Sequence, residues 1–398
     1  MPPRVLVAMS GGVDSSVAAL LLKEEGYEVV GAHMKLWDYV DVGGDRHRDG
    51  RCCSLDAVTD CRLVCDRIGA PFYVLNMSAP FRAAVIENFV SEYRAGRTPN
   101  PCVLCNTDIK WSGFLHKARE IGCDYIATGH YAVIEQGENG RWRIRKGVDA
   151  TRDQSYVLWG VSQDALAMTL MPLGRRYKKD VRAFAARVGL RTAAKPESRE
   201  ICFVADNDYR RFLREWEQKH GLKRRPGEIV HEDGRVLGRH AGTVDFTVGQ
   251  RRGIGLEHPL PEPVYVQRID AISGRVTVGS NSSLFRDELV AERVNWVAHP
   301  PPARDQTSTY AAGENPGGPA PAAAESPAAG AATATGVSFD ALVKIRYLHT
   351  PGHARITCLA DGRVHVKFTD RQRAITPGQS VVLYDGAIVL GGGIIAGP

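Results

Sequence analysis

The amino-acid sequence predicts an α/β protein with a doubly wound parallel-sheet domain, then a small central β-domain and a C-terminal β-barrel. In the first 130 residues, short apolar runs alternate with longer helical patterns, the order expected of parallel βαβ units. Between residues 227 and 279, β-branched residues and turn pairs such as Asp233-Gly234 are frequent. Similar strand patterns return after residue 339 and continue close to the C-terminus.

The first domain is expected to hold four parallel strands separated by helices. The strand Arg4–Met9 is a continuous apolar run that ends in a glycine turn, as buried parallel strands do. The other strands are predicted at 28–34, 72–76 and 125–128, and the helices at 13–25, 55–68, 80–93 and 107–121. A ligand of such a sheet is expected at the carboxyl ends of the strands.

After residue 129 the pattern changes, with a hairpin predicted at 131–146 and helices up to about residue 189. Residues 301–336 include 23 Ala, Pro and Gly among 36, and we interpret them as a disordered insertion. The predicted division is a first domain over 1–205 with a helical part, a central β-rich domain over 206–285, and a barrel over 286–398 that the insertion interrupts.

Composition restricts the class of protein. Of the 398 residues, 43% are hydrophobic and 24% charged, which excludes a mostly disordered or fibrous chain. We find no apolar run of membrane-spanning length and no secretory signal, so we expect a cytoplasmic protein without membrane contact. Nine cysteines in a reducing compartment favour chemistry or a metal over disulfides.

Positive charge is concentrated in one segment. The net charge is +6, but residues 141–199 carry 14 Lys and Arg against 5 Asp and Glu, a surplus of +9. Residues 1–140 carry 14 against 18, or −4. A solvated cationic face would explain this surplus, and so would a surface that binds a nucleic-acid backbone.

A glycine- and serine-rich loop follows the first predicted strand. Its sequence from Ser10 to Ser16 is SGGVDSS, and it opens the first predicted helix. Glycines let the backbone approach an anion closely, and the helix N-terminus supplies N–H donors and positive potential. The spacing and lysine of a Walker A loop are absent. The loop resembles the pyrophosphate-binding loop of ATP-pyrophosphatases, which adenylate a substrate; the alternative is a turn that only caps the helix.

Two cysteines are candidates for the group that displaces AMP from an adenylated substrate. Cys105 lies just before the helix predicted from 107, and Cys202 lies before another predicted near Asp206. A helix N-terminus is expected to lower the pKa of a thiol and make it more nucleophilic. Judged from spacing alone, a simply buried cysteine is the alternative for each.

Several separated motifs resemble those of the bacterial tRNA-specific 2-thiouridylases, which thiolate the wobble uridine of certain tRNAs. They occur in the order of that family and cover essentially the whole chain outside 301–336. The matching segments are 10–16 (SGGVDSS), 31–34 (GAHM), 98–101 (TPNP), 105–106 (CN), 127–131 (ATGHY), 153–156 (DQSY), 201–203 (ICF), 247–253 (TVGQRRG), 344–347 (KIRY) and 376–379 (TPGQ).

The resemblance implies an ATP-dependent tRNA sulfurtransferase. The uracil 2-carbonyl oxygen would attack the α-phosphate of ATP, and a persulfide on Cys202 would then supply sulfur. Cys105 would be the nucleophile that frees this sulfur by forming a disulfide with Cys202, or it would act through hydrogen sulfide. Mg²⁺ is expected at the phosphates, where Asp14 would position it or only cap the helix. The residues implied to bind ATP are Ala8, Met9, Ser10, Gly11, Gly12, Val13, Asp14, Ser15, Met34 and Gly129.

The same resemblance implies partners and contacts. The partners are the anticodon loop of tRNA and a sulfur donor or relay protein supplied by a cysteine desulfurase. The residues implied to meet tRNA or its target base are Asn100, Pro101, Cys102, His130, Arg152, Asp153, Gln154, Arg346, Tyr347 and Gln379. A uridine in a loop can be unstacked at modest cost and held in such a pocket.

One position departs from the family pattern. Many members carry Asp where this chain has Cys102, so D-x-x-C becomes C-x-x-C. Cys102, Cys105 and Cys202 would make three thiolate ligands for a [4Fe-4S] cluster or zinc, but we favour the persulfide route and assign no metal firmly.

The remaining cysteines and two histidines are expected to be structural. The other cysteines are Cys52, Cys53, Cys61, Cys65, Cys123 and Cys358, for which we favour packing over metal binding. His33 and His116 have no ligand spacing. The competing functions are another ATP-pyrophosphatase, such as an amidotransferase-type synthetase, and a non-catalytic tRNA-binding module.

Overall fold

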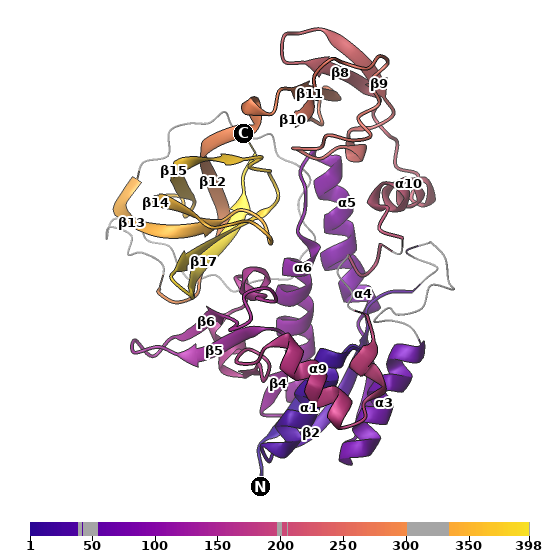
Figure 1. The fold of residues 1–398 in the computed structure, drawn as a ribbon, viewed down its shortest axis with the longest axis vertical. Coiled ribbons are helices and arrows are strands. Elements are labelled where there is room, and N and C mark those ends of the chain that lie inside the picture. Colours follow the sequence, from indigo (N-terminus) through magenta and orange to yellow (C-terminus); the bar gives the residue numbers. More distant parts are fainter. Residues whose placement is uncertain (39–41, 43–54, 197–200, 205, 301–333, 398) are drawn as a thin grey trace.

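The chain forms three bodies joined around a pair of long helices (Figure 1). The structure is a computed structural model that describes residues 1–38, 42, 55–196, 201–204, 206–300 and 334–397. Most of the insertion predicted at 301–336 therefore lies outside the described residues, as do Cys52 and Cys53. In the described part, no helix is long and apolar enough to cross a membrane.

The N-terminal domain is built on a five-stranded parallel sheet, in the order β3-β2-β1-β4-β7. Alternate residues of β1 face opposite sides: Val5 and Val7 join one apolar core, while Leu6 and Ala8 join the other. Both sides are covered by helices, so the predicted doubly wound domain is confirmed. The strands are β1 (Arg4–Met9), β2 (Glu28–Lys35), β3 (Phe72–Asn76), β4 (Tyr125–Ala127) and β7 (Thr169–Leu170).

Helices of the first domain lie on the two faces of this sheet. The core on one face includes side chains of α1 (Val13–Glu24), α3 (Leu55–Ile68) and α9 (Lys178–Arg187). The opposite core includes side chains of η2 (Cys105–Phe114) and α7 (Leu115–Glu120). Strands β2 and β3 follow on one side of β1, whereas β4 and β7 lie on its other side. The direction in which strands are added to the sheet therefore reverses between β1 and β4. Ligands bind at the carboxyl ends of strands at such a point.

Two helices begin earlier than the sequence predicted. One runs through α4 (Ser78–Phe81), η1 (Arg82–Ile86) and α5 (Glu87–Arg94). The other starts with α6 (Pro101–Leu104) and continues through η2 into α7, whereas we had expected it from residue 107. Proline suits the first helical position because its fixed φ is helical and its missing N–H is not needed there. Cys105 consequently lies inside this helix and not ahead of it, and the predicted reason for a lowered thiol pKa does not apply.

Short elements complete the helical part that follows β4. They are β5 (Ala132–Gln136), β6 (Trp142–Lys146), η3 (Ser155–Leu158), α8 (Gln163–Ala167) and η4 (Arg191–Ala194). Strands β5 and β6 form the predicted hairpin, and β6 also pairs with a barrel strand, which the sequence did not indicate. The first domain and the barrel thus share one sheet.

The central domain is a four-stranded sheet in the order β10-β11-β8-β9, preceded by helix α10 (Tyr209–Lys219). Its strands surround an apolar core that includes Ile229, Phe246 and Val266. The strands are β8 (Gly227–His231), β9 (Val236–His240), β10 (Tyr265–Asp270) and β11 (Arg275–Gly279), with the short turns η5 (Thr243–Asp245) and η6 (Ser282–Leu284).

The C-terminal strands close into a six-stranded antiparallel barrel, because β12 pairs with both β15 and β17. Its core consists mainly of valine, isoleucine and leucine side chains. The predicted barrel is confirmed. Its strands are β12 (Phe285–Trp296), β13 (Ala334–Lys344), β14 (Gly352–Leu359), β15 (Val364–Arg373), β16 (Ser380–Asp385) and β17 (Ile388–Ile395).

Candidate active site

The glycine-rich loop lies at the carboxyl end of β1, where the strand order reverses. Gly11 has a φ of +71°, and a Cβ there would lie 2.6 Å from the backbone of Ala57, so only glycine fits. Ser15 Oγ accepts a hydrogen bond from Ser10 N at 3.1 Å and thereby folds the loop over the start of α1. Gly12 is the N-cap and has no side chain to cap the first N–H groups. This backbone is shaped to hold phosphate oxygens.

The loop is flanked by the ends of two neighbouring strands. Met34 lies near the carboxyl end of β2 and packs between two apolar cores. Gly129 follows β4, and a Cβ there would lie 2.8 Å from backbone atoms of Asp14 and Ser15. The structure thus brings the predicted nucleotide residues to one edge of the sheet, with glycine required at two of them.

The contacts of Asp14 do not suit a metal ligand. Both of its carboxylate oxygens lie 2.7 Å from the Nζ atom of Lys178, and Tyr131 donates a hydrogen bond to Oδ1 at 2.8 Å. A carboxylate paired with a cation in this way is a poor resident Mg²⁺ ligand. Mg²⁺ fits here as an ion carried by substrate phosphates and water, as is common for this metal.

Cys105 and Cys202 pack against the same apolar cluster, although 97 residues separate them in sequence. Both half-buried cysteines pack against the core formed by the α4–α5 helix, α10 and Ile109 of η2. Both are thiols in this structure. The structure therefore places both candidate cysteines in one region of the molecule.

A buried aromatic side chain fixes the turn that carries Cys202. Phe203 is fully buried, with ring centroids 5.2 Å from Phe89, 5.4 Å from Phe212 and 5.8 Å from Phe81. Its neighbour Val204 donates a backbone hydrogen bond to Ile201. The anchored turn leaves the adjacent Cys202 at the edge of the cluster.

The helix start at Asn100 and Pro101 is held against the barrel. Gln379 donates hydrogen bonds from Nε2 to the carbonyl oxygens of Thr98 and Pro99, both at 3.1 Å. A hydrogen bond between Asn100 and the buried Tyr156 holds the same segment from the other side. The ring of Tyr156 lies 6.2 Å from that of Tyr347 and 6.0 Å from the Nζ atom of Lys344.

Cys102, at this helix start, lies within electrostatic reach of both Lys110 and Tyr347. Desolvation by the surrounding protein raises the pKa of the Cys102 thiol, although the residue reaches solvent, and Lys110 opposes the shift. Lys110 is itself held by Asn106 Oδ1 at 2.9 Å. The site thus places a cation beside a protonated thiol.

His130 is a neutral, buried part of the same region. Burial lowers the pKa of His130 well below its ordinary value, and the charge of Lys110 lowers it further. The ring lies 5.5 Å from that of Trp111, and Nδ1 is 2.8 Å from Thr128 Oγ1. The imidazole is therefore uncharged at neutral pH.

The segment Arg152-Asp153-Gln154 lies between this region and the nucleotide loop. Asp153 accepts hydrogen bonds from Gly147 N and Ser155 N, both at 3.1 Å. Gln154 exchanges two hydrogen bonds with the backbone of Tyr131. Arg346, on the loop after β13, donates to the Arg373 carbonyl at 3.1 Å. Residues from two domains are thus assembled around one surface.

Comparison with known proteins identifies the family. Residues 3–206 match the model of the "tRNA methyl transferase HUP domain", 217–280 its "PRC-barrel domain" and 324–395 the "Aminomethyltransferase beta-barrel domain". A tRNA-specific 2-thiouridylase MnmA from Geotalea uraniireducens is 49% identical over 98% of this chain and 94% of its own length. The chain belongs to the tRNA-specific 2-thiouridylase family. Thiouridylases from Geobacter metallireducens and Symbiobacterium thermophilum are 46% and 45% identical over 98% of this chain and 96% and 92% of their own lengths.

The described part of this thiouridylase does not group side chains as ligands for an iron–sulfur cluster. Among the described residues, no three His, Cys, Asp or Glu side chains are grouped as metal ligands. Cys102, Cys105 and Cys202 are all described, so the three-thiolate set considered from the sequence is not assembled in this structure. The cluster is therefore not supported.

The structural cysteines of this thiouridylase lie in cores. Cys61 and Cys65 are fully buried on α3, and burial raises the pKa of each thiol to about 12. Cys123 and Cys358 are also buried. His33 is less ordinary than expected, since it is buried with Nδ1 3.0 Å from the Met9 carbonyl and 3.9 Å from Cys61 Sγ.

Sequence reasoning missed three lysines at the site. Lys178 pairs with Asp14, Lys195 bonds the Gly11 carbonyl and Asp60 at 3.0 Å each, and Lys110 lies near Cys102. Lys178 and Lys195 come from segments more than 160 residues after the loop, so no local spacing indicates them. Lys110 follows Asn106 by four residues, a helical contact that an earlier helix start would have indicated.

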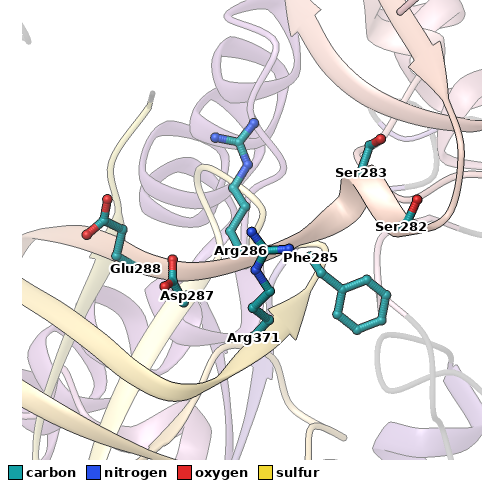
Figure 2. Close-up of a pocket in the computed structure, with 7 residues that line it drawn as sticks. All are labelled: Ser282, Ser283, Phe285, Arg286, Asp287, Glu288 and Arg371. Carbon is teal, nitrogen blue, oxygen red and sulfur yellow. The ribbon is translucent and has the colours of Figure 1, made fainter.

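An open depression lies away from these residues, where the central domain meets the barrel (Figure 2). Arg286 of β12 and Arg371 of β15 project there beside the hydroxyl groups of Ser282 and Ser283. The depression contains none of the predicted site residues.

Proposed function

We propose that this chain is an ATP-dependent tRNA-uridine 2-sulfurtransferase that converts the wobble uridine to 2-thiouridine, with AMP and pyrophosphate as co-products. The observation that carries the proposal is the packing of Cys105 and Cys202 against one cluster, in a chain with a glycine-rich loop at a helix N-terminus. The near full-length likeness to thiouridylases supports the substrate. We also propose the division into units 1–205, 206–285 and 286–398.

The first step is adenylation. The loop of Ser10 to Ser15, with Ala8 and Met9 before it, would hold the ATP phosphates through backbone N–H groups, while Met34 and Gly129 flank the adenosine. The uracil 2-carbonyl oxygen attacks the α-phosphorus, and pyrophosphate leaves. Bound Mg²⁺ supplies charge neutralisation for that leaving group. Asp14, held by Lys178, keeps the first turn of α1 in place.

The second step is sulfur transfer. The terminal sulfur of a Cys202 persulfide attacks C2 of the adenylated uridine, and AMP leaves with the former carbonyl oxygen. The thiolate of Cys105 then attacks Cys202 Sγ, breaks the S–S bond and leaves the second sulfur on the uridine. The resulting Cys105–Cys202 disulfide is reduced by a thiol reductant. A donor or relay protein that receives sulfur from a cysteine desulfurase reloads Cys202.

The target base is proposed to enter between the helix start and the barrel. Asn100, Pro101 and Cys102 would line the base pocket beside the neutral His130. The surrounding tRNA contacts would come from Arg152, Asp153, Gln154, Arg346, Tyr347 and Gln379. The hydrogen bonds from Gln379 to the Thr98–Pro99 backbone join the barrel to the first domain, which supports a pocket of fixed width.

The test is thiolation of unmodified tRNA by the purified chain with ATP, Mg²⁺ and a sulfur source, read on a gel that retards thiolated tRNA. Cys105→Ala and Cys202→Ala are each expected to lower the rate more than about a thousandfold. Cys358→Ala, in the barrel core, is the matched control and should retain thiolation. Absence of product with the unaltered chain, or full activity of either site variant, would contradict the proposal.

A further inference from the structure

A partly buried ion pair lies at the nucleotide loop, with the Asp14 side chain 31% exposed. The side chain of Lys178 is 8% exposed, and its Nζ lies 2.7 Å from both oxygens of Asp14. Tyr131 is 3% exposed and donates its hydroxyl proton to Asp14 Oδ1 at 2.8 Å. Asp14 is the second residue of α1, so these bonds fix the turn whose N–H groups face the phosphates. Hydrogen bonds to a charged group are the stronger kind.

Tyr131 also connects this pair to the segment Arg152-Asp153-Gln154. Its backbone N–H donates to Gln154 Oε1, and its carbonyl accepts from Gln154 N, both at 2.9 Å. These two bonds make the position of Tyr131 depend on the conformation of Gln154. One residue therefore contacts the nucleotide loop through its side chain and the tRNA-facing segment through its backbone.

Lys178 provides a second connection between the same two places. Its backbone N–H donates to Asp149 Oδ2 at 2.9 Å, and the carbonyl of Asp149 accepts from Arg152 N at 2.9 Å. Asp149 Oδ1 accepts from Thr151 as well. Both groups that hold Asp14 are thus bonded, within two steps, to the turn that carries Arg152 and Gln154.

We propose that Tyr131 is a positioning residue that couples tRNA binding to ATP binding. Contact of tRNA with Arg152 and Gln154 fixes the backbone of Tyr131, its hydroxyl fixes Asp14, and Asp14 fixes the phosphate loop. ATP is therefore held most tightly when tRNA is present, which limits adenylation in its absence. This inference rests on the proposed function, because it takes the Arg152–Gln154 segment to contact tRNA. The coupling must be reciprocal, since each ligand changes the affinity of the other by one factor.

The experiment measures the Kd of a non-hydrolysable ATP analogue with and without saturating unmodified tRNA. In the unaltered chain, tRNA is expected to tighten binding about tenfold, and the analogue should tighten tRNA binding by the same factor. In Tyr131→Phe, which keeps the ring and loses the hydroxyl, both factors should fall below about twofold. Tyr27→Phe removes a hydroxyl at the opposite edge of the sheet and should behave as the unaltered chain.

Three results would overturn the coupling. The first is that tRNA has no effect on the Kd of the analogue in the unaltered chain, and the second is that Tyr131→Phe shows the same factors as the unaltered chain. The third is that Tyr131→Phe weakens binding of the analogue equally with and without tRNA. The last would show a purely local role for the hydroxyl. Thiolation by the unaltered chain under the same conditions separates the two proposals. If thiolation proceeds and one of these results is found, the coupling alone fails; if no thiolation occurs, the proposed function fails.

Discussion

At the scale of single residues, burial distinguishes two pairs of cysteines. Cys61 and Cys65 lie in the core beside α1, where burial raises the pKa of each thiol to about 12 and keeps it protonated. Cys105 and Cys202 lie at the edge of a core and are half-buried. Because the thiolate is the reactive form, the first pair is suited to packing, whereas the second pair is accessible to a substrate.

Replacing Cys102 tests whether Cys105 and Cys202 are sufficient for sulfur transfer. Desolvation raises the pKa of its thiol, so the group is protonated at pH 7. We expect Cys102→Ser, which keeps a small neutral group at the proposed base pocket, to retain thiolation within about fivefold, since an ordinary hydrogen bond contributes about 1 kcal/mol. Single-turnover thiolation rates provide the measurement. A loss comparable to that of Cys105→Ala would show that the third thiol takes part in sulfur chemistry.

His33 is expected to make stability depend on pH. Burial lowers the pKa of His33, although its bond to the Met9 carbonyl opposes the shift, and its Nε2 has no partner among the described residues. The unfolded chain, with a histidine pKa near 6.5, then binds more protons, so the unfolding free energy falls as pH drops below about 6.5.

Replacing this histidine should flatten that dependence. His33→Asn keeps an N–H donor toward Met9 and cannot be protonated. Between pH 7 and pH 5, its unfolding free energy should therefore fall by up to about 2 kcal/mol less than that of the unaltered chain. Urea unfolding at both pH values gives the difference. An identical decrease in both proteins would contradict the assignment.

At the scale of elements, local patterns predicted most helices and strands, and long-range contacts explain the differences. The strands Arg4–Met9 and Phe72–Asn76 and the helix Leu55–Ile68 have the bounds predicted from their apolar periodicity. The helix that begins at Pro101 starts six residues before the predicted position 107. Pairing of β6 with β17 could not be predicted, because it joins residues more than 240 positions apart.

The same distinction holds for the candidate site. Gly11 and Gly12 were predicted because the loop, strand and helix are contiguous in sequence. The ion pair of Asp14 with Lys178 was not predicted, because it depends on α9 packing beside α1 (Figure 1). Sequence reasoning therefore proposed the reacting groups and missed the groups that hold the loop in place.

Gly11 and Gly26 provide a matched test of the loop at the two ends of α1. Both have positive φ, but a Cβ at Gly11 would meet the Ala57 backbone at 2.6 Å, whereas nothing lies within 4 Å of one at Gly26. We expect Gly11→Ala to lower ATP affinity at least about tenfold, together with a loss of about 1–3 kcal/mol in unfolding free energy. Gly26→Ala should cost about 1 kcal/mol and leave ATP affinity unchanged. Calorimetric titration and urea unfolding give both quantities, and equal effects of the two variants on ATP affinity would contradict the account of the loop.

At the scale of the whole molecule, the barrel and the first domain are joined beside the proposed base pocket. They share the β6–β17 pairing, and Gln379 bonds the backbone next to Asn100. The charge surplus predicted for 141–199 is partly neutralised by acids outside that segment. Lys178 pairs with Asp14, Lys195 with Asp60, and Arg175 with Glu135. Cations elsewhere must therefore contribute to any surface for a long polyanion.

The depression of Figure 2 offers two such cations beside two carboxylates, Asp287 and Glu288, which pair with Lys367 at 2.9 and 3.5 Å. Arg286 and Arg371 project from adjacent barrel strands, and Arg373 lies two residues further along β15, where its carbonyl accepts from Arg346. If both arginines contact tRNA phosphates, Arg286→Ala with Arg371→Ala should reduce the slope of log Kd against log salt by about 1 to 2. Arg355→Ala with Arg363→Ala, at ion-paired exposed sites of the barrel, is the control and should leave the slope unchanged. An unchanged slope in the first double variant would exclude this surface.

We propose that sulfur reaches uridine from Cys202 after ATP-dependent activation. The most direct measurement loads the purified chain with isotopically labelled persulfide, removes the donor, and adds unmodified tRNA with ATP and Mg²⁺ for a single turnover. Mass spectrometry of the tRNA and of the nucleotide then counts the labelled sulfur and AMP. We predict one labelled sulfur in tRNA for each AMP formed, and none from Cys202→Ala. Labelled 2-thiouridine from Cys202→Ala, or thiolation without AMP, would contradict the account.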